Sequence, residues 1–561
     1  MTVPQLQPAN IALTLSQQAR QQPDQLAVIC PQGRDLYGHV RYLQLSCRQL
    51  ERESDQRAWA LQRLGLRPGM RTVLMVPPGL DFFSLTFALF KLGAVPVLID
   101  PGMGLRNIRN CLQQVQPEAF IGSGKAHAAR LLFGWGKNSL RHRLTTGSIP
   151  LPDSARLCDL LTVTASEPWP CHRPTTDAVA AILFTSGSTG PPKGAVYRHS
   201  QFNAQIAALK QLYNIQPGEQ DLCTFPLFAL FAPALGMTAI VPDMDASRPG
   251  QVNAQRLFEA FDDFRIDNLF GSPALLRRLA DAGRHQGRQL GSLKRIISAG
   301  APVPASLLED LSSLLKPETQ IFTPYGATEA LPVASIGSHE ILADTRILTD
   351  AGRGICVGRP LAGLQLAIIA IDDAPIRDWR QARQLPVGQI GEICVRGLQV
   401  TDSYWQLPDA TAAAKIPCAD GGFYHRMGDV GYLDESGRLW FCGRKNHRVE
   451  LTAADADQPQ TLFSIPCEAP FNRHPAVART ALVGCRQQGR QRALLCIETR
   501  RPTTAPAREQ IAAELRQIQQ QHRHCQAISG FLFHPGFPVD VRHNAKIFRE
   551  KLALWATRQL S

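Results

Sequence analysis

The sequence predicts an α/β protein whose large N-terminal domain contains α/β sheets and a β-rich subdomain and is followed by a small α+β C-terminal domain. In the first half of the chain, short apolar strands alternate with amphipathic helices, which is typical of a parallel sheet covered by helices. From about residue 362, short strands follow one another across turns, which indicates a β-rich part. The chain has 561 residues. At roughly 150 residues a domain it can bury several cores, so folding requires no disulfide or metal ion.

Each expected element of the first half is an apolar run or a helical stripe that ends at a turn residue. Apolar residues three and four positions apart predict the helices, and Gly65 ends the first of them. Unbroken apolar runs predict the strands, and Asp100-Pro101-Gly102 stops one of these. In order, the elements are a helix over 54–64, a strand over 72–76, a helix over 81–91, strands over 95–98 and 180–184, a strand over 268–270 leading to a helix from Ser272, and a strand over 295–298.

The second half is expected to contain short strands and one long helix. Strands are predicted over 366–371 and 391–396, together with a hairpin over 429–442 that turns at Glu435-Ser436-Gly437. Residues 450–469 have no periodicity and carry Asp and Pro, so an exposed connection is expected there. A small unit follows, with strands over 476–483 and 493–498 and a helix over 508–521. We therefore expect residues 1–445 to form the large domain and residues 446–561 to form the small one.

Composition excludes several classes of protein. The 60 Lys and Arg residues exceed the 47 Asp and Glu residues, for a net charge of +13. The Lys and Arg residues stand singly or in pairs, which favours a solvated Arg-rich surface over nucleic-acid binding. A weak attraction to an anionic membrane stays open. The 14 cysteines form no C-x-x-C or zinc pattern, and the chain starts without a secretory signal. Reduced thiols and a cytoplasmic location are therefore expected.

Residues 223–242 raise the question of a transmembrane helix, because twenty residues without a charge reach the length that such a helix needs. Three prolines, Pro226, Pro233 and Pro242, would each remove a backbone donor and disturb such a helix. We expect a buried segment that lines an apolar pocket, and no transmembrane segment. Its phenylalanines Phe225, Phe228 and Phe231 are either the wall of a tunnel for alkyl chains or ordinary core.

Residues 185–194 (TSGSTGPPKG) follow a buried strand and bear the strongest chemical signal. Their glycines, hydroxyls and lysine can surround a polyphosphate with backbone N–H groups, side-chain donors and one cation. A Walker loop would need Gly-Lys followed by Ser or Thr at the start of a helix. Here Pro191 and Pro192 precede the lysine and Gly194 follows it, which excludes that motif. The predicted phosphate-binding residues are Thr185, Ser186, Gly187, Ser188, Thr189, Gly190 and Lys193.

This loop resembles the phosphate-binding signature of the adenylate-forming superfamily, which includes acyl-CoA synthetases, firefly-type luciferases and peptide-synthetase adenylation domains. Five further segments resemble superfamily motifs in the same order, so the resemblance covers essentially the whole chain. They are 298–302 (SAGAP), 323–329 (TPYGATE), 424–429 (YHRMGD), 443–445 (GRK) and 544–547 (NAKI).

The resemblance implies how the chain would hold a nucleotide. Tyr325 would stack on adenine, Asp429 would accept hydrogen bonds from the ribose diol, and Arg444 would reach ribose or phosphate as a fixed cation. The adenine-binding wall would include Gly300, Ala301, Pro302, Gly326 and Ala327.

The resemblance also implies the catalytic residues. Thr328 would donate its hydroxyl to the α-phosphate, and Glu329 would bind the Mg²⁺ that accompanies ATP. Lys193 would hold phosphate oxygens, and Lys546 would stabilise the negative charge that grows as pyrophosphate leaves. Because Lys546 lies about 100 residues beyond the hinge at Asn446, the small domain would have to move to deliver it.

The chain departs from thiol-transferring relatives after the hinge, since no glycine occurs between Gly443 and Gly484 where they have a Gly-containing loop. This places the use of coenzyme A in doubt. Several segments, including FPLFALFAPALG and FPVDVRHNAKIFREKLALWA, resemble more closely the β-lactone synthetases of bacterial olefin biosynthesis. That resemblance implies ATP-dependent activation of a long-chain 2-alkyl-3-hydroxyalkanoic acid and closure to a β-lactone with release of AMP. It leaves open assembly with the β-lactone decarboxylase and reductase of the same route.

Three classes of function stay open from the sequence. A β-lactone synthetase would need a base for the 3-hydroxyl proton, for which His199 and His447 are candidates, although a lone histidine is often structural. A long-chain fatty acyl-CoA or acyl-AMP ligase would share the first half-reaction. A non-enzymatic protein of lipid surfaces would use the positive charge alone.

Overall fold

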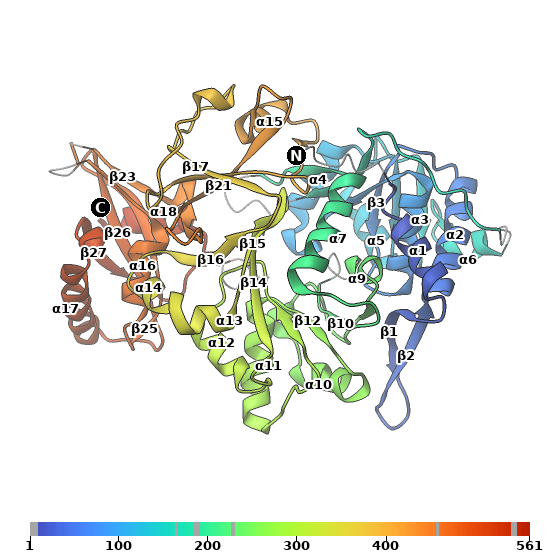
Figure 1. Cartoon of the computed structure of the whole chain (residues 1–561), viewed down its shortest axis with the longest axis horizontal. Helices are drawn as coiled ribbons and strands as arrows, with labels where there is room; N and C mark the ends of the chain where they lie inside the picture. Colours follow the sequence, from blue (N-terminus) through green and yellow to red (C-terminus); the bar gives the residue numbers. More distant parts are fainter. Residues whose placement is uncertain are drawn as a thin grey trace.

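The computed structural model of the chain describes residues 9–162, 167–184, 191–225, 230–452, 454–455, 459–539 and 547–560. The predicted α/β class is confirmed, with a large N-terminal part that contains two sheets and a small α+β part at the C-terminus. In Figure 1, helix α17 of the small C-terminal part and helices α1 to α3 of the large part lie at opposite ends of the long axis.

An eight-stranded sheet organises the N-terminal part, in the strand order β19-β9-β8-β4-β3-β5-β6-β7. The strands from β8 to β7 run parallel, while β9 and β19 join β8 in antiparallel fashion. Helices α2 and α3 cover one face, and α4 and α5 cover the other. The strands are β3 (Arg71–Met75), β4 (Val95–Leu98), β5 (Ala119–Gly122), β6 (His142–Thr145), β7 (Ala155–Arg156), β8 (Val179–Phe184), β9 (Gly194–Arg198) and β19 (Ser403–Tyr404). The helices are α1 (Leu13–Gln21), α2 (Cys47–Arg63), α3 (Leu80–Leu92), η1 (Pro101–Met103), α4 (Leu105–Val115), α5 (Gly124–Phe133) and α6 (Leu157–Leu161).

A fourteen-stranded sheet forms the rest of the large part, in the order β17-β18-β21-β22-β16-β15-β14-β13-β12-β10-β11-β1-β2, with β20 beside β21. The run from β14 to β1 is parallel. Helices α10 to α12 cover one face of this run, and α7 and α9 lie on the other, where one continuous core joins the two sheets.

The strands of this sheet are β1 (Leu26–Arg34), β2 (Val40–Ser46), β10 (Gln220–Cys223), β11 (Thr238–Ile240), β12 (Asn268–Phe270), β13 (Arg295–Ile297), β14 (Gln320–Ala327), β15 (Ala330–Gly337), β16 (Ile355–Pro360), β17 (Gln365–Ile369), β18 (Gly391–Arg396), β20 (Lys415–Pro417), β21 (Phe423–Leu433) and β22 (Leu439–Arg444). The helices around it are α7 (His199–Tyr213), α9 (Phe231–Leu235), η2 (Pro249–Gln251), α10 (Ala254–Asp263), α11 (Pro273–Gln286), α12 (Ala305–Ser312), α13 (Ser338–Glu340), η3 (Ile341–Thr345), α14 (Arg346–Asp350), η4 (Trp379–Gln381) and α15 (Pro408–Ala414).

The residues after β22 build cores of their own. Helices α16 and α17 cover one face of the sheet β25-β26-β27, and α18 covers the other. The elements are η5 (Lys445–His447), the hairpin β23 (Val449–Leu451) and β24 (Gln460–Leu462), α16 (Ser464–Asn472), β25 (Val477–Gln487), β26 (Arg490–Thr499), α17 (Ala505–Gln521), η6 (Arg523–Cys525), β27 (Ile528–Phe533) and α18 (Arg549–Leu560). These separate cores are compatible with a domain boundary at residues 445 and 446, which stays a prediction.

Most predicted elements are confirmed, and β4 matches the predicted strand residue for residue. The helix predicted from residue 54 begins earlier, at Cys47, because Ser46 caps it by accepting a hydrogen bond from the Gln49 N–H at 3.3 Å. The exposed connection predicted over 450–469 is wrong, since its described part contains the hairpin β23–β24 and helix α16. Helix α16 forms despite Pro466 and Pro470 because it buries Phe471 against the C-terminal sheet.

The apolar segment over 223–242 contains the end of β10, helix α9 and strand β11, all buried in the core that joins the two sheets. No helix in the described ranges has the length and apolar character needed to cross a membrane. All fourteen cysteines are free thiols, and most are buried.

Candidate active site

Two of the predicted motifs lie where parallel strands end. Segment 298–302 follows β13 directly, and Gly300 adopts a φ of +94°, a left-handed conformation that favours glycine. Strands β14 and β15 form a hairpin whose tip is Thr328 and Glu329. A Cβ atom at Gly326 would lie 2.6 Å from the Ala330 carbonyl oxygen, so only glycine fits this tight hairpin end. Both segments lie at the carboxyl edge of the sheet, where ligands bind in open α/β folds.

Three motifs distant in the sequence join at the expected ribose site. The Tyr325 hydroxyl donates a hydrogen bond to Asp429 Oδ2 at 2.7 Å, and Arg444 Nη1 lies 2.9 Å from Asp429 Oδ1. Asp429 and Arg444 face each other on the paired strands β21 and β22. Burial raises the pKa of Asp429 above its ordinary value, and the Arg444 charge opposes that rise. The structure thus brings Tyr325, Asp429 and Arg444 together around one buried carboxylate.

The phosphate end of the site is built around Glu329. The Tyr404 hydroxyl donates to Glu329 Oε1 at 2.7 Å, and the Lys193 ammonium lies 5.2 Å from the centre of the Tyr404 ring. The neighbouring Thr328 is held through its carbonyl oxygen, which accepts a hydrogen bond from the Tyr197 hydroxyl. The structure therefore brings Lys193, Thr328 and Glu329 together. The sequence analysis missed Tyr197 and Tyr404, because nothing in their local sequence distinguishes them from core tyrosines.

Two predicted parts of the phosphate site, residues 185–190 and Lys546, lie outside the described residues. Phe184 of β8 pairs with Gly194 of β9, so the two ends of the loop lie side by side. Strand β19 pairs with β9 on its other edge, placing Tyr404 opposite Ala195. The strand pairing therefore holds the base of the loop next to the Glu329 cluster.

The residues at this end fit a Mg²⁺ ion that is bound mainly through ATP. Glu329 supplies a carboxylate, and the described residues contain no group of three or more His, Cys, Asp or Glu side chains that could hold a metal by themselves. Mg²⁺ is commonly bound by one or two carboxylates together with substrate phosphates and water. Glu329 is thus a suitable protein ligand for such an ion.

An apolar cavity of about 500 Å³, its opening included, lies between α7, α9 and the strands β10 to β15. It contains Phe231 of the predicted substrate residues, and the nearby Phe225 ring lies 6.2 Å from the ring of Phe270 in the cavity wall. Phe228 lies outside the described residues. The cavity adjoins the nucleotide site through Pro324, next to Tyr325. Its wall includes Leu209, Tyr213, Ile215, Leu235, Met237, Ile297, Leu331 and Pro332, with Asp221 and Asn268 as polar members.

The two candidate bases lie in different surroundings. His199 begins α7 but does not line the cavity, and its Nδ1 accepts a hydrogen bond from the Ile11 N–H at 3.2 Å. Burial lowers the pKa of His199 to about 4. His447 lies at the hinge with its Nε2 3.6 Å from Glu550 Oε1 of α18. Burial and the charges of Arg549 and Arg444 lower the pKa of His447 to about 3, so both imidazoles are neutral near pH 7.

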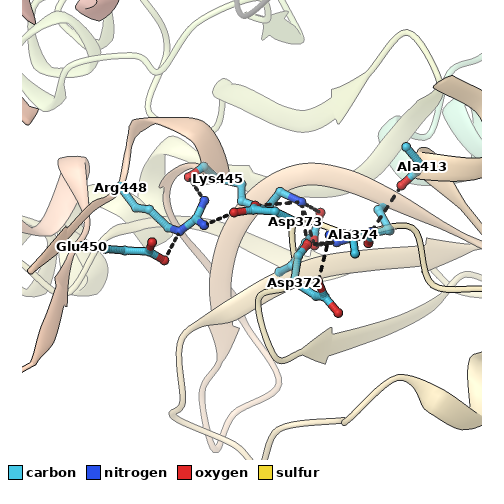
Figure 2. A network of polar contacts seen from close by, with 9 residues as sticks. Asp372, Asp373, Ala374, Ala413, Lys445, Arg448 and Glu450 are labelled. Carbon is cyan, nitrogen blue, oxygen red and sulfur yellow. Dashed lines mark hydrogen bonds and ion pairs between the residues drawn. The ribbon is translucent and has the colours of Figure 1, made fainter. Parts of the chain in front are cut away.

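The predicted hinge is held by charged side chains on both sides of Asn446 (Figure 2). Lys445 Nζ donates to the Asp372 carbonyl oxygen at 3.0 Å, and Arg448 Nη2 donates to Asp373 Oδ2 at 2.6 Å. Arg448 Nε also donates to Glu450 Oε1 at 2.7 Å. Asn446 itself is exposed. The segment after β17 therefore fastens the residues that flank the hinge in this conformation.

Comparison with known proteins places these features in context. Residues 15–405 match the family of AMP-binding enzymes. The chain is 46% identical over 564 residues to an olefin beta-lactone synthetase of Xanthomonas campestris pv. campestris, covering 98% of each chain. It is 48% identical over 574 residues to an olefin beta-lactone synthetase of Stenotrophomonas maltophilia, covering 99% of each. The amide bond synthetase McbA of Marinactinospora thermotolerans has the same fold, with a TM-score of 0.77, 21% identity, and coverage of 97% of this chain and 99% of that one.

Proposed function

The chain belongs to the AMP-binding enzyme family, and from that premise we propose that it is an olefin β-lactone synthetase. Its substrate would be a long-chain 2-alkyl-3-hydroxyalkanoic acid, which ATP activates and the enzyme closes to a β-lactone with release of AMP and diphosphate. The observation that carries this proposal is the identity of nearly half of all residues, over the whole chain, with two enzymes of that name.

In the first half-reaction, a carboxylate oxygen of the acid attacks the α-phosphorus of ATP. The bond from that phosphorus to the bridging oxygen breaks, pyrophosphate leaves with the electron pair, and an acyl-adenylate remains. Lys193, Thr328 and Lys546 hold the phosphate oxygens and counter their charge. Glu329 would hold Mg²⁺, which would neutralise part of the phosphate charge. The convergence of Lys193, Thr328 and Glu329 supports this assignment.

In the second half-reaction, the substrate's 3-hydroxyl oxygen attacks the activated carbonyl carbon. The bond from that carbon to the AMP oxygen breaks, AMP leaves with the electron pair, and the hydroxyl proton passes to a base. A four-membered ring is strained, so the reaction needs a good leaving group, and the tethered hydroxyl needs no separate binding site. His447 is the better placed candidate base, because the charge of Arg444 in the nucleotide site acts on it, whereas His199 does not line the cavity.

The apolar cavity supports the choice of a long-chain substrate. Its wall contains Phe231 and other apolar side chains, and Pro324 in that wall is next to Tyr325 of the proposed nucleotide site. We propose that it takes one alkyl chain. We further propose that residues 446–561 move as a unit to bring Lys546 to the phosphates, that the enzyme works in the cytoplasm, and that it assembles with a β-lactone decarboxylase and a reductase.

Mass spectrometry of the products formed from ATP, Mg²⁺ and a synthetic 2-alkyl-3-hydroxy acid tests the proposal. The expected products are a β-lactone, AMP and diphosphate in equal amounts. The same reaction with added coenzyme A separates the alternative, a long-chain acyl-CoA ligase. Formation of an acyl-CoA at the rate of ATP consumption would overturn the lactone assignment.

A further inference from the structure

Lys415 is a buried lysine of strand β20 with no role in the mechanism described above. It is 6% exposed, and lysine is rarely buried unless its charge is compensated. The ammonium donates a hydrogen bond to the Thr401 carbonyl oxygen and lies 5.1 Å from the centre of the Phe423 ring. Neither partner is an anion, so any group that compensates the charge of the Lys415 ammonium must lie farther away.

Two carboxylates and one histidine form the electrostatic surroundings of Lys415. Burial lowers the pKa of Lys415 to about 7, and the charges of Glu329 and Asp402 oppose that fall. His425 faces Lys415 across the paired strands β20 and β21, and burial followed by the Lys415 charge lowers the pKa of His425 well below its ordinary value. The imidazole is therefore neutral, and the attraction to Lys415 comes from Glu329 and Asp402.

A chain of hydrogen bonds leads from Lys415 to Glu329. The Thr401 carbonyl accepts from Lys415, and the Thr401 N–H donates to the Glu329 carbonyl oxygen at 2.8 Å. The Thr401 hydroxyl donates to the same oxygen at 3.2 Å. Three residues further on, Tyr404 donates to the Glu329 carboxylate. Residues 401–404 thus hold both the backbone and the side chain of Glu329.

The same segment is anchored at its other side. Asp402 Oδ2 accepts a hydrogen bond from Arg198 Nη2 of β9 at 2.6 Å, and Ser403 and Tyr404 pair with β9. Lys415 lies on a different strand, β20, so it attaches residues 401–404 to the β-rich part of the sheet. A methionine would pack equally well against Phe423 and would avoid the cost of burying a charge. The Lys415 side chain is therefore explained by its bond to Thr401 and, in its protonated form, by its attraction to Glu329.

We propose that Lys415 is a positioning residue for Glu329, ordering residues 401–404 so that the Glu329 carboxylate is directed at the metal-bound phosphates of ATP. The inference rests on the proposed role of Glu329 in binding Mg²⁺. Partners that orient a metal ligand typically contribute about 10- to 100-fold in metal affinity or activity. Loss of the ammonium should therefore weaken the response to Mg²⁺ by about 10-fold or more while ATP still binds through its base and ribose.

The test measures ATP–pyrophosphate exchange over a range of Mg²⁺ concentrations for the full chain and for Lys415→Met. The variant should need at least about 10-fold more Mg²⁺ for half-maximal exchange, and Lys415→Arg, which keeps the charge, should recover part of the loss. Lys91→Met is the matched control, because Lys91 is 1% exposed and its charge is compensated by Glu51 and Asp55 of helix α2. It should lower the melting temperature without changing the Mg²⁺ requirement.

Glu329→Gln separates the two levels of the argument. If Glu329→Gln leaves the Mg²⁺ requirement unchanged, the proposed metal role of Glu329 fails. If Glu329→Gln raises that requirement and Lys415→Met does not, only the positioning role of Lys415 is overturned. Should Lys415→Met not fold, Lys415→Gln removes the charge and ends one bond short of the position from which the ammonium donates to Thr401, and a wild-type Mg²⁺ requirement in that variant would equally overturn the proposal.

Discussion

Replacement of Asp429 by Asn should weaken ATP binding far more than it weakens the fold. The Asp429 carboxylate is 3% exposed and accepts from Tyr325 at 2.7 Å while facing Arg444 at 2.9 Å. Its proposed ligand is the ribose diol, whose hydroxyls would donate charge-assisted hydrogen bonds. An asparagine in its place is neutral and presents an N–H group on the side where the carboxylate accepted. The variant therefore loses the charge and one acceptor position.

The magnitude follows from these contacts. Hydrogen bonds to charged groups contribute about 1.5–3 kcal/mol each, and a tenfold change in binding corresponds to about 1.4 kcal/mol. Loss of one such bond should therefore raise the KM for ATP about 10- to 100-fold. The loss of folding stability should be smaller, about 1–2 kcal/mol, for two reasons. The Arg444 side chain is 34% exposed and can be solvated, and burial already makes the Asp429 charge costly.

Initial rates of ATP–pyrophosphate exchange at varied ATP, combined with urea unfolding, measure both effects. Asp434→Asn is the matched control, since Asp434 lies on the same hairpin and accepts from Arg438 Nε at 2.8 Å and Trp440 Nε1 at 2.9 Å. The control should lose stability without a change in the KM for ATP. An unchanged KM in Asp429→Asn, or equal changes in both variants, would refute the ribose assignment.

Three further predictions concern other parts of the enzyme. Lys546→Ala should slow formation of lactone from ATP and acid by about 10²–10³-fold but slow cyclisation of synthetic acyl-adenylate much less; equal losses in both assays would contradict a role limited to adenylation. His199→Asn should keep an acceptor for the Ile11 N–H and remove a group whose pKa falls from 6.5 to about 4 on folding. Below pH 6.5 the unfolded chain binds this proton more readily than the folded chain, so wild-type stability declines as the pH drops from about 6.5 toward 4, and the variant should avoid about 2 kcal/mol of that loss at pH 5. Urea unfolding at pH 5 and 7.5 measures the difference. An identical pH dependence in both proteins would show that His199 does not titrate this way. Phe231→Trp should fill part of the apolar cavity and raise the KM for acids with long alkyl chains several-fold while leaving short-chain acids unaffected; equal effects on both would exclude the cavity as the alkyl site.

Much of the fold could be predicted because strands and helices leave local signals. Strand β4 lies at the predicted residues because its apolar run ends at Asp100-Pro101-Gly102, residues that favour a turn. Helix α16 gave no such signal. It contains two prolines and follows a polar stretch, and it is helical because Phe471 and Glu468 find partners in the C-terminal sheet and in Arg549 of α18.

The site was predictable only where a motif carries its chemistry within a few neighbouring residues. Thr328 and Glu329 lie at one hairpin tip, so their proximity follows from the sequence itself. Tyr404 and Lys415 belong to no motif. Each reaches Glu329 from more than seventy residues away, through the pairing of β19 with β9 and of β20 with β21.

By itself, then, the sequence determined the α/β class, the order of most elements and the chemistry of the nucleotide motifs, because hydrophobic period and turn residues act over a few positions. Only the tertiary structure decided which neighbours hold those groups. It assigned His199 to the Ile11 amide and away from the cavity, joined Tyr325 to Arg444 through Asp429, and linked Lys415 to Glu329 through Thr401. The burial and the charge of a side chain depend on every group that packs around it. Those groups come from segments whose separation in the sequence carries no information about their distance in space.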